Sequence, residues 1–228
     1  YKEGAEASVA VLKVGEEISL RVGGKPDASS HGDMTTQTGL TLIPELLHAR
    51  APEDVLVIGL GSGVSAGAAL ALPSVKKVDV VEMSPEVVEA SVHFAPWNKL
   101  KYTNPRPPTW IVTPKVEVIV NDARNHLLLS SRKYDVIASE PSNPWMAGVG
   151  NLFTEEAFQL ARSRLKPGGV MCQWIHSYSL ESEQFFSVIR TFTKVFPNAH
   201  LWQTAHVDFL LIGFADEGHQ LSAAQLRN

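Results

Sequence analysis

The chain is poor in cysteine and has no long apolar run, and each scarcity excludes a class of protein. Cys172 is the one cysteine among 228 residues, which excludes an internal disulfide and a cysteine-rich metal site. It follows Val170 and Met171 in an apolar run, so we expect a buried structural thiol. No apolar run approaches the roughly 18 residues that a membrane span needs, and no signal peptide is recognisable.

Strong charge and metal-ligand spacing are also missing. The formal net charge is −4, and this mildly acidic balance argues against nucleic acid as the main partner. The histidines are scattered without the spacing of metal ligands, so we expect no metal. With 44% hydrophobic and 19% charged residues, the composition is that of an ordinary globular protein.

The first 50 residues differ in pattern from the rest. Residues 7–22 alternate around Gly15 and predict an antiparallel hairpin, residues 23–27 read as a turn, and residues 35–49 suit a helix. We therefore expect a small N-terminal β-hairpin subdomain with its connecting helix over 1–50 and a second domain over 51–228. The chain begins at Tyr1 in a strand-like pattern, so it could be a piece of a longer protein.

Beyond residue 50, short apolar strands alternate with helical segments. Such alternation predicts βαβ units and an α/β fold, with a mostly parallel sheet covered by helices on both faces. The strands expected in this sheet are 55–58, 78–81, 116–120, 134–139 and 170–174, followed by two more at 200–203 and 209–214.

A glycine-rich turn follows the first of these strands. Gly59, Gly61 and Gly63 stand between the strand and a helix, where glycine lets the backbone turn tightly and approach a ligand. A dinucleotide site needs the spacing Gly-x-Gly-x-x-Gly, whereas this spacing is Gly-x-Gly-x-Gly. We associate it with S-adenosylmethionine-type ligands. The alternative is that the glycines serve only a tight turn.

Three carboxylates stand at the carboxyl ends of successive strands, the edge where ligands bind in such sheets. Glu82 is placed to accept hydrogen bonds from both hydroxyls of a ribose. Asp122 could accept from an exocyclic amine, and Glu140 would then face the reactive end of a bound nucleoside. The alternatives are that these acids only cap helices, or that Glu140 pairs with Arg124.

Together these residues resemble the spermidine synthase (polyamine aminopropyltransferase) family over nearly the whole chain. The segments that carry the resemblance are 57–63, 81–82, 121–123, 134–137 and 172–173. The resemblance implies a small N-terminal β domain and a Rossmann-like, methyltransferase-type domain. It implies transfer of an aminopropyl group from decarboxylated S-adenosylmethionine to a putrescine-like diamine, giving spermidine and methylthioadenosine.

The resemblance also implies roles for particular residues on the donor side. Glu82 matches the ribose ligand, Asp122 with Ala123 matches the adenine ligand, and Gln37 falls where the family has Tyr-His-Glu or Tyr-Gln-Glu. Glu140 replaces the first loop aspartate of the family, its catalytic acid/base, and keeps the carboxylate on a longer arm.

On the acceptor side the loop departs from the family. Asn143 stands in place of the second aspartate and could hydrogen-bond an amine, and Thr36 replaces a tyrosine. Trp145, with Trp174 or Tyr178 from the next strand end, could contact an alkylammonium through its ring, or could be core packing. The matching segment 172–173 adds Gln173 to the acceptor side. We also expect Asp33 to border the donor pocket, and His176 follows a strand end near the proposed site.

Two other functions remain open at this point. One is a methyltransferase that uses intact S-adenosylmethionine, since Asn-Pro-Trp at 143–145 faintly resembles a motif of amino-methylating enzymes. The other is a non-catalytic domain that senses a nucleoside or polyamine.

The resemblance also implies an assembly and a location. Members of the family are commonly oligomers, so we expect a homo-oligomer, and we expect it to be cytoplasmic. The Ser-Glu-Pro-Ser-Asn-Pro-Trp loop at 139–145 also resembles a subgroup fused to membrane-spanning segments, in which this chain would be the soluble domain.

Overall fold

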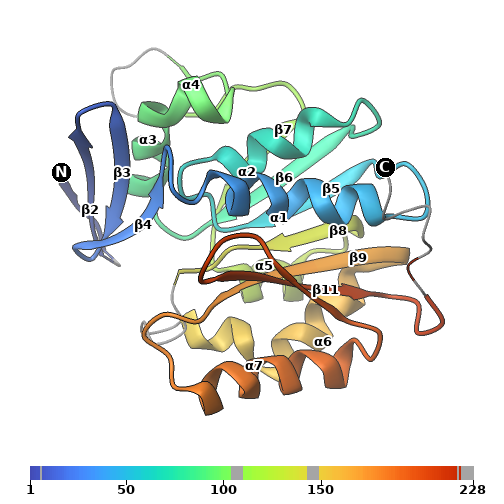
Figure 1. Ribbon diagram of the computed structural model, residues 1–228. Helices are drawn as coiled ribbons and strands as arrows, with labels where there is room; N and C mark the ends of the chain where they lie inside the picture. Colours follow the sequence, from blue (N-terminus) through green and yellow to red (C-terminus); the bar gives the residue numbers. More distant parts are fainter. Residues whose placement is uncertain (6, 104–109, 143–148, 220, 222–228) are drawn as a thin grey trace.

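A computed structural model describes residues 1–5, 7–103, 110–142, 149–219 and 221. The chain forms a small antiparallel sheet and a larger, mostly parallel sheet with helices on both faces (Figure 1). The predicted Rossmann-like architecture with a separate N-terminal β subdomain is confirmed. None of the helices in these described ranges is both long and apolar enough to cross a membrane.

The N-terminal sheet has four strands in the order β1-β2-β3-β4. They are β1 (Lys2–Glu3), β2 (Ser8–Val14), β3 (Glu17–Val22) and β4 (Lys25–Ser29). The predicted hairpin is the β2–β3 pair. The expectation of a turn over 23–27 was wrong in extent, because Gly23 and Gly24, with positive φ, complete the turn by themselves. Pro26 is tolerated in β4 because that strand lies at the edge of the sheet.

The large sheet has the order β10-β11-β9-β8-β5-β6-β7, in which β11 runs antiparallel to its neighbours β10 and β9 and all other neighbouring strands are parallel. Its strands are β5 (Asp54–Ile58), β6 (Lys77–Glu82), β7 (Val116–Val120), β8 (Tyr134–Ser139), β9 (Leu165–His176), β10 (His200–Gln203) and β11 (Asp208–Phe214). The predicted strand at 170–174 is longer than expected, because pairing with β8 already begins at Leu165.

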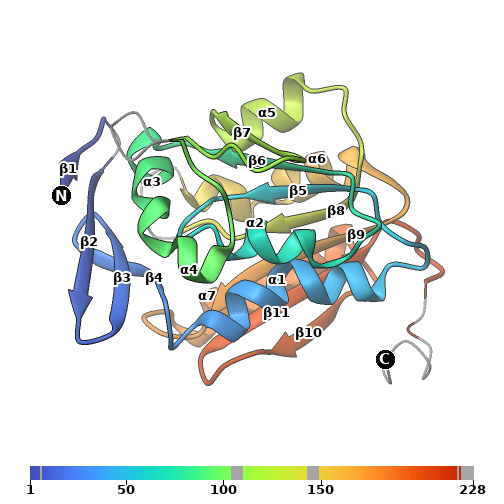
Figure 2. The same cartoon turned by 90° about the horizontal axis from the view of Figure 1, so that it is seen from above.

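Helices lie on both faces of this sheet (Figure 2). One face carries α5 (Ala123–Leu129), α6 (Glu155–Arg164) and α7 (Ser182–Val195), while the other carries α1 (Met34–Leu47), α2 (Val64–Ala68), α3 (Pro85–Ala90) and α4 (Ala95–Asn98). Short 3₁₀ turns occupy 69–71, 91–94 and 149–153.

The side chains of β5 show how the core is divided between the two faces. Leu56 and Ile58 point into the cluster under α5, α6 and α7, while Val55 and Val57 point into the opposite cluster, because successive strand residues face opposite ways. Leu20 of the small sheet joins the second cluster, so that sheet packs onto the large domain. Helix α1 contacts β8, β9 and β11 of the large sheet. The domain division near residue 50 stays a prediction.

Candidate active site

The glycine turn and the segment after β8 meet at the carboxyl edge of the large sheet. The amide of Gly59 donates to the carbonyl of Val81, and the amide of Glu140 donates to the carbonyl of Ile58 at 2.8 Å. Gly59, Gly61 and Gly63 have φ values of 86°, 50° and 81°, a region that L side chains rarely adopt. The turn therefore requires these glycines, and it brings β5, β6 and β8 to one edge.

A cavity of about 400 Å³ opens at this edge, against the N-terminal sheet. Its lining includes six of the predicted site residues: Asp33, Gln37, Gly61, Glu140, Trp174 and Tyr178. The other lining residues are Pro26, Asp27, Ala28, Ser29, Gly32, Thr36, Ser62, Pro141, Ala205, His206, Val207 and Asp208.

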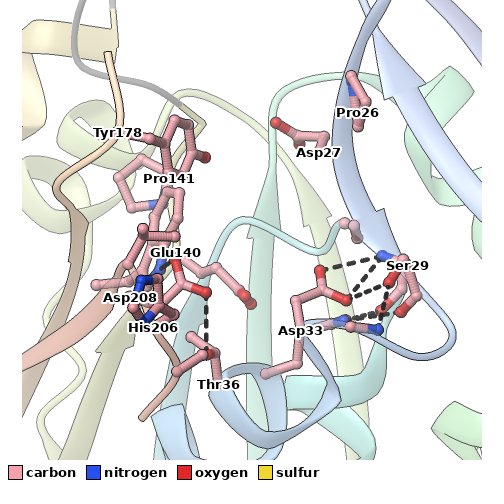
Figure 3. A pocket seen from close by; sticks show the side chains of 18 residues that line it. Pro26, Asp27, Ser29, Asp33, Thr36, Glu140, Pro141, Tyr178, His206 and Asp208 are labelled. Atoms are coloured by element: carbon pink, nitrogen blue, oxygen red, sulfur yellow. Dashed lines mark hydrogen bonds between the residues drawn. The ribbon is translucent and has the colours of Figure 1, made fainter. Parts of the chain in front are cut away.

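Acidic side chains occupy two opposing walls of the cavity (Figure 3). Asp27 of β4 and Asp33, just before α1, lie on one side. Glu140, after β8, and Asp208, the first residue of β11, lie on the other. Among the described lining residues there is no lysine or arginine. A ligand that carries positive charge at more than one point would suit such walls.

Glu140 is held by a buried serine at the start of α2. Ser65 Oγ donates to Glu140 Oε2 at 2.6 Å. The pKa of Glu140 is raised to about 8, chiefly by burial; the Ser65 bond lowers it, and the nearby carboxylates of Asp33, Asp27 and Asp208 contribute to the rise. A carboxyl group with a pKa close to neutral is suited to proton transfer at physiological pH.

Asp208 and Asp27 accept hydrogen bonds from hydroxyl or ring donors, and the charge of Lys25 also acts on Asp27. Asp208 accepts from Thr36 Oγ1 and from Trp174 Nε1, both at 3.3 Å. Asp27 accepts from Ser142 Oγ at 2.6 Å. Burial raises the pKa of both carboxyl groups. Their orientation is thus set before any ligand binds, and a cationic ligand would stabilise their charged forms.

Aromatic rings continue this wall along the end of β9. The Trp174 and His176 ring centroids are 5.0 Å apart, and His176 stacks on Tyr178 at 3.9 Å. His176 Nδ1 donates to the Tyr178 carbonyl at 3.0 Å, and burial lowers the pKa of His176 to about 4. His176 is therefore neutral at physiological pH and supports Tyr178. Lys25 Nζ lies 5.2 Å from the Tyr178 ring centroid.

The predicted nucleoside ligands lie at the same edge but do not line the cavity. Glu82 accepts from the amides of Leu60 at 2.9 Å and Ser84 at 2.8 Å, so both of its oxygens are oriented, and burial raises its pKa. Asp122 caps α5 by accepting from the Asn125 amide at 2.8 Å. Asp122 therefore has a structural role whether or not it also binds a ligand.

Four further predicted residues either do not line the cavity or lie beyond the described ranges. Ala123 is buried at the start of α5, and Gln173 is buried with Nε2 donating to the Trp174 carbonyl at 3.0 Å. Asn143 and Trp145 lie outside the described residues. Gly59 and Gly63, which also do not line the cavity, shape the turn.

Sequence reasoning missed Asp27, Ser65 and Asp208. Asp27 lies in the stretch that was interpreted as a turn, and Ser65 is one small residue in a small-residue helix. Asp208 directly precedes the last predicted strand, and this position at a strand end was the one signal that could have identified it. The described residues contain no group of three or more His, Cys, Asp or Glu that could hold a metal ion.

Comparisons with known proteins show the family to which the chain belongs. A family model described as "Spermine/spermidine synthase domain" matches residues 34–209. Polyamine aminopropyltransferase 2 of Hyperthermus butylicus is 32% identical over 156 residues, which is 67% of this chain and 48% of that protein. Putrescine N-methyltransferase 2 of Nicotiana attenuata is 28% identical over 156 residues, 67% of this chain and 39% of that protein.

A solved structure of similar fold is a spermidine synthase in complex with the transition state analogue AdoDATO. It superimposes with a TM-score of 0.79 at 19% identity, over 99% of this chain and 79% of that one. A likeness at this identity shows the fold alone. The chain spans about half the length or less of the curated relatives named above.

Proposed function

Since the chain belongs to the spermine/spermidine synthase family, we propose that it transfers an aminopropyl group from decarboxylated S-adenosylmethionine to a putrescine-like diamine. The products are spermidine and methylthioadenosine. The proposal rests on one observation, which is that Glu140 lies at a strand end in a cavity with three further carboxylates and no described lysine or arginine in its lining.

The distribution of charge supports a polycationic acceptor. A diamine carries one positive charge at each end near neutral pH, because alkylamines have pKa values near 10. Asp208, fixed by Thr36 and Trp174, is suited to the distal ammonium group, while Glu140 is suited to the attacking amine. The faces of Trp174 and Tyr178 would border the alkyl chain and add cation–π attraction.

Glu140 would act as the general base. An amine attacks carbon only through its lone pair, so the ammonium group must first lose a proton. In the reaction the amine nitrogen bonds to the carbon next to the sulfonium, the carbon–sulfur bond breaks, and the electron pair stays on sulfur. The amine proton passes to Glu140, a step worth about 10²- to 10⁴-fold in rate.

The donor is proposed to be decarboxylated because of the same acidic walls. Intact S-adenosylmethionine carries a carboxylate, which Asp27, Asp33 and Glu140 would repel. The decarboxylated form carries only positive charge on this side chain, on its sulfonium and its ammonium group. Glu82 would bind the ribose hydroxyls through lone pairs that its bonds to Leu60 and Ser84 leave unused.

A methyltransferase is the second candidate, favoured by the putrescine N-methyltransferases among the relatives. That reaction would share the amine and the base Glu140, and it would differ in the donor and in the carbon that is transferred.

A product assay separates these candidates. The protein is incubated with putrescine and either decarboxylated or intact S-adenosylmethionine. Methylthioadenosine together with spermidine supports the proposal, and S-adenosylhomocysteine with an N-methylated amine supports the second candidate. If neither product appears with putrescine or with a panel of longer amines although the nucleoside binds, the proposed activity is refuted in favour of a sensing domain.

The homo-oligomeric state and cytoplasmic location that the resemblance implies stay part of this proposal. Sedimentation velocity of the purified chain tests the first, and fractionation of cells that express the full-length protein tests the second.

A further inference from the structure

The hydroxyl group of Ser65 faces two acceptors but carries one proton. Its oxygen is 2.6 Å from Glu140 Oε2 and 2.9 Å from the backbone carbonyl oxygen of Gln37. A serine hydroxyl can donate only one full hydrogen bond. Ser65 is 1% exposed, so water does not supply an alternative partner. Its proton must therefore favour one acceptor or be shared between the two.

The residue that carries the second acceptor, Gln37, and the backbone of Ser65 itself are both held in place by the surrounding chain. Gln37 is anchored at each end of its side chain, because Nε2 donates to the Ser29 carbonyl at 2.9 Å and Oε1 accepts from Ser62 Oγ. Thr41 Oγ1 donates to the Ser65 carbonyl at 3.0 Å and fixes the backbone that carries the hydroxyl. Only the hydroxyl hydrogen has to rotate for Ser65 to change its acceptor.

We propose that Ser65 is a positioning residue for Glu140, which bonds the ionised carboxylate and turns its proton to the Gln37 carbonyl when the carboxylate is neutralised. This inference rests on the proposed function, in which Glu140 receives the proton of the amine. With Oε2 held by Ser65, Oε1 is the oxygen left to receive that proton.

The charge of Glu140 decides which of the two acceptors the Ser65 hydroxyl bonds. An O–H···O⁻ bond is shorter and roughly twice as strong as a neutral one, and 2.6 Å lies in the range of charge-assisted bonds. Once the amine nitrogen gives its proton to Glu140, Oε2 is no stronger an acceptor than a peptide carbonyl. Ser65 can then bond Gln37, so no buried donor is left without a partner in either state.

Charged and titratable groups on four segments act on Glu140 together with Ser65. Asp27 of β4, Asp33 before α1 and Asp208 of β11 raise the pKa of Glu140, while burial and the charge of Glu140 raise the pKa of the Cys172 thiol in β9. All of them are acids, so their ionisation opposes that of Glu140. Ser65 is the side-chain hydrogen-bond donor that opposes this repulsion.

Titration of Glu140 in Ser65→Ala tests the inference without requiring turnover. The full chain is labelled with ¹³C at the glutamate side-chain carboxyl groups, and the Glu140 signal is assigned by its loss in Glu140→Gln. We expect the Glu140 midpoint to rise by about one pH unit in Ser65→Ala, because the anion loses its donor. Ser65→Thr keeps the hydroxyl, so its Glu140 midpoint is expected to stay close to the wild-type value.

Ser62→Ala is the matched control, because it removes a neighbouring buried hydroxyl that bonds Gln37 and not Glu140. In Ser62→Ala the pH midpoint of the Glu140 titration is expected to stay at the wild-type value, whatever the change in activity. An unchanged midpoint in folded Ser65→Ala, or the same rise in Ser62→Ala, would overturn the inference.

Kinetics provide a second readout that a merely structural role would not move. Ser65→Ala is expected to lose about 10-fold in kcat/KM at pH 7 and to recover most of it at pH 9.5, where Glu140 is ionised again. A loss of the same size at both pH values contradicts the role. If wild type yields no product with any amine, the proposed function fails, while the titration still decides the inference.

Discussion

The backbone of Glu140 lies against Gly59 so closely that a Cβ atom added to Gly59 would be 2.5 Å from the Glu140 carbonyl oxygen. Real Cβ atoms do not approach backbone this closely. The first glycine of the turn therefore makes room for the neighbouring strand end that carries the proposed base. The glycine pattern and the acidic segment, which are far apart in the sequence, form one structural unit.

Gly59→Ala is expected to lower both stability and activity. Alanine at a φ of 86° costs about 1–2 kcal/mol by itself, and the contact with Glu140 adds to that cost by displacing the base. Gly24→Ala is the matched control, since Gly24 has a φ of 81° and no atom within 4 Å of an added Cβ. Thermal unfolding and the product assay should show a larger loss of Tm in Gly59→Ala and a loss of activity only there.

The pH dependence of turnover should report the pKa of Glu140. Because burial raises that pKa to about 8, the free enzyme holds Glu140 protonated at pH 6 and ionised at pH 9. A base must be ionised to accept a proton, so kcat/KM for the amine is expected to rise through pH 8. A further rise near pH 10 belongs to the amine itself.

Glu140→Gln separates the two rises, or limbs, of the pH–rate profile, one near pH 8 and one near pH 10. The variant should lose about 10²- to 10⁴-fold in kcat and lack the limb near pH 8, while the limb of the amine persists. If the variant keeps the limb near pH 8, another group is the base.

Asp208→Asn should weaken binding of the acceptor rather than of the donor. The amide keeps the shape of the side chain but removes the charge proposed to hold the distal ammonium group, so KM for putrescine is expected to rise about 10- to 100-fold. Butylamine lacks the second ammonium group and is the matched substrate, and its KM should change little. Equal losses for both amines would show that Asp208 acts only through its bonds to Thr36 and Trp174.

Local patterns explain why much of the fold and part of the site could be predicted from the sequence. Apolar runs bounded by turn residues identify buried strands, and a carboxylate after such a run lies at the ligand edge, which is how Glu82, Asp122 and Glu140 were found. Asp27 could not be found in this way, because its place in the cavity depends on how the small sheet packs onto the large one. Nor could Ser65, because its role comes from a rotatable hydroxyl between two distant segments.

Glu45 is a buried carboxyl group. No pattern in the sequence predicts its burial, and the proposed reaction does not use it. It lies on α1 with 1% of its surface exposed, and within the described part of the chain neither side-chain oxygen has a hydrogen-bond partner. Burial raises its pKa from 4.5 to about 9. Between these two values the folded chain retains a proton that the unfolded chain releases, so stability falls as pH rises across this window.

Glu45→Gln should remove this dependence, since an amide does not ionise. The variant is expected to match wild type in unfolding free energy near pH 4.5 and to exceed it by about 1–3 kcal/mol at pH 8.5. Urea unfolding at a series of pH values measures this difference. Glu16→Gln, on the exposed β2–β3 turn, is the control and should follow wild type throughout. A Glu45→Gln curve parallel to wild type would mean that Glu45 is ionised in the folded protein and has found a partner.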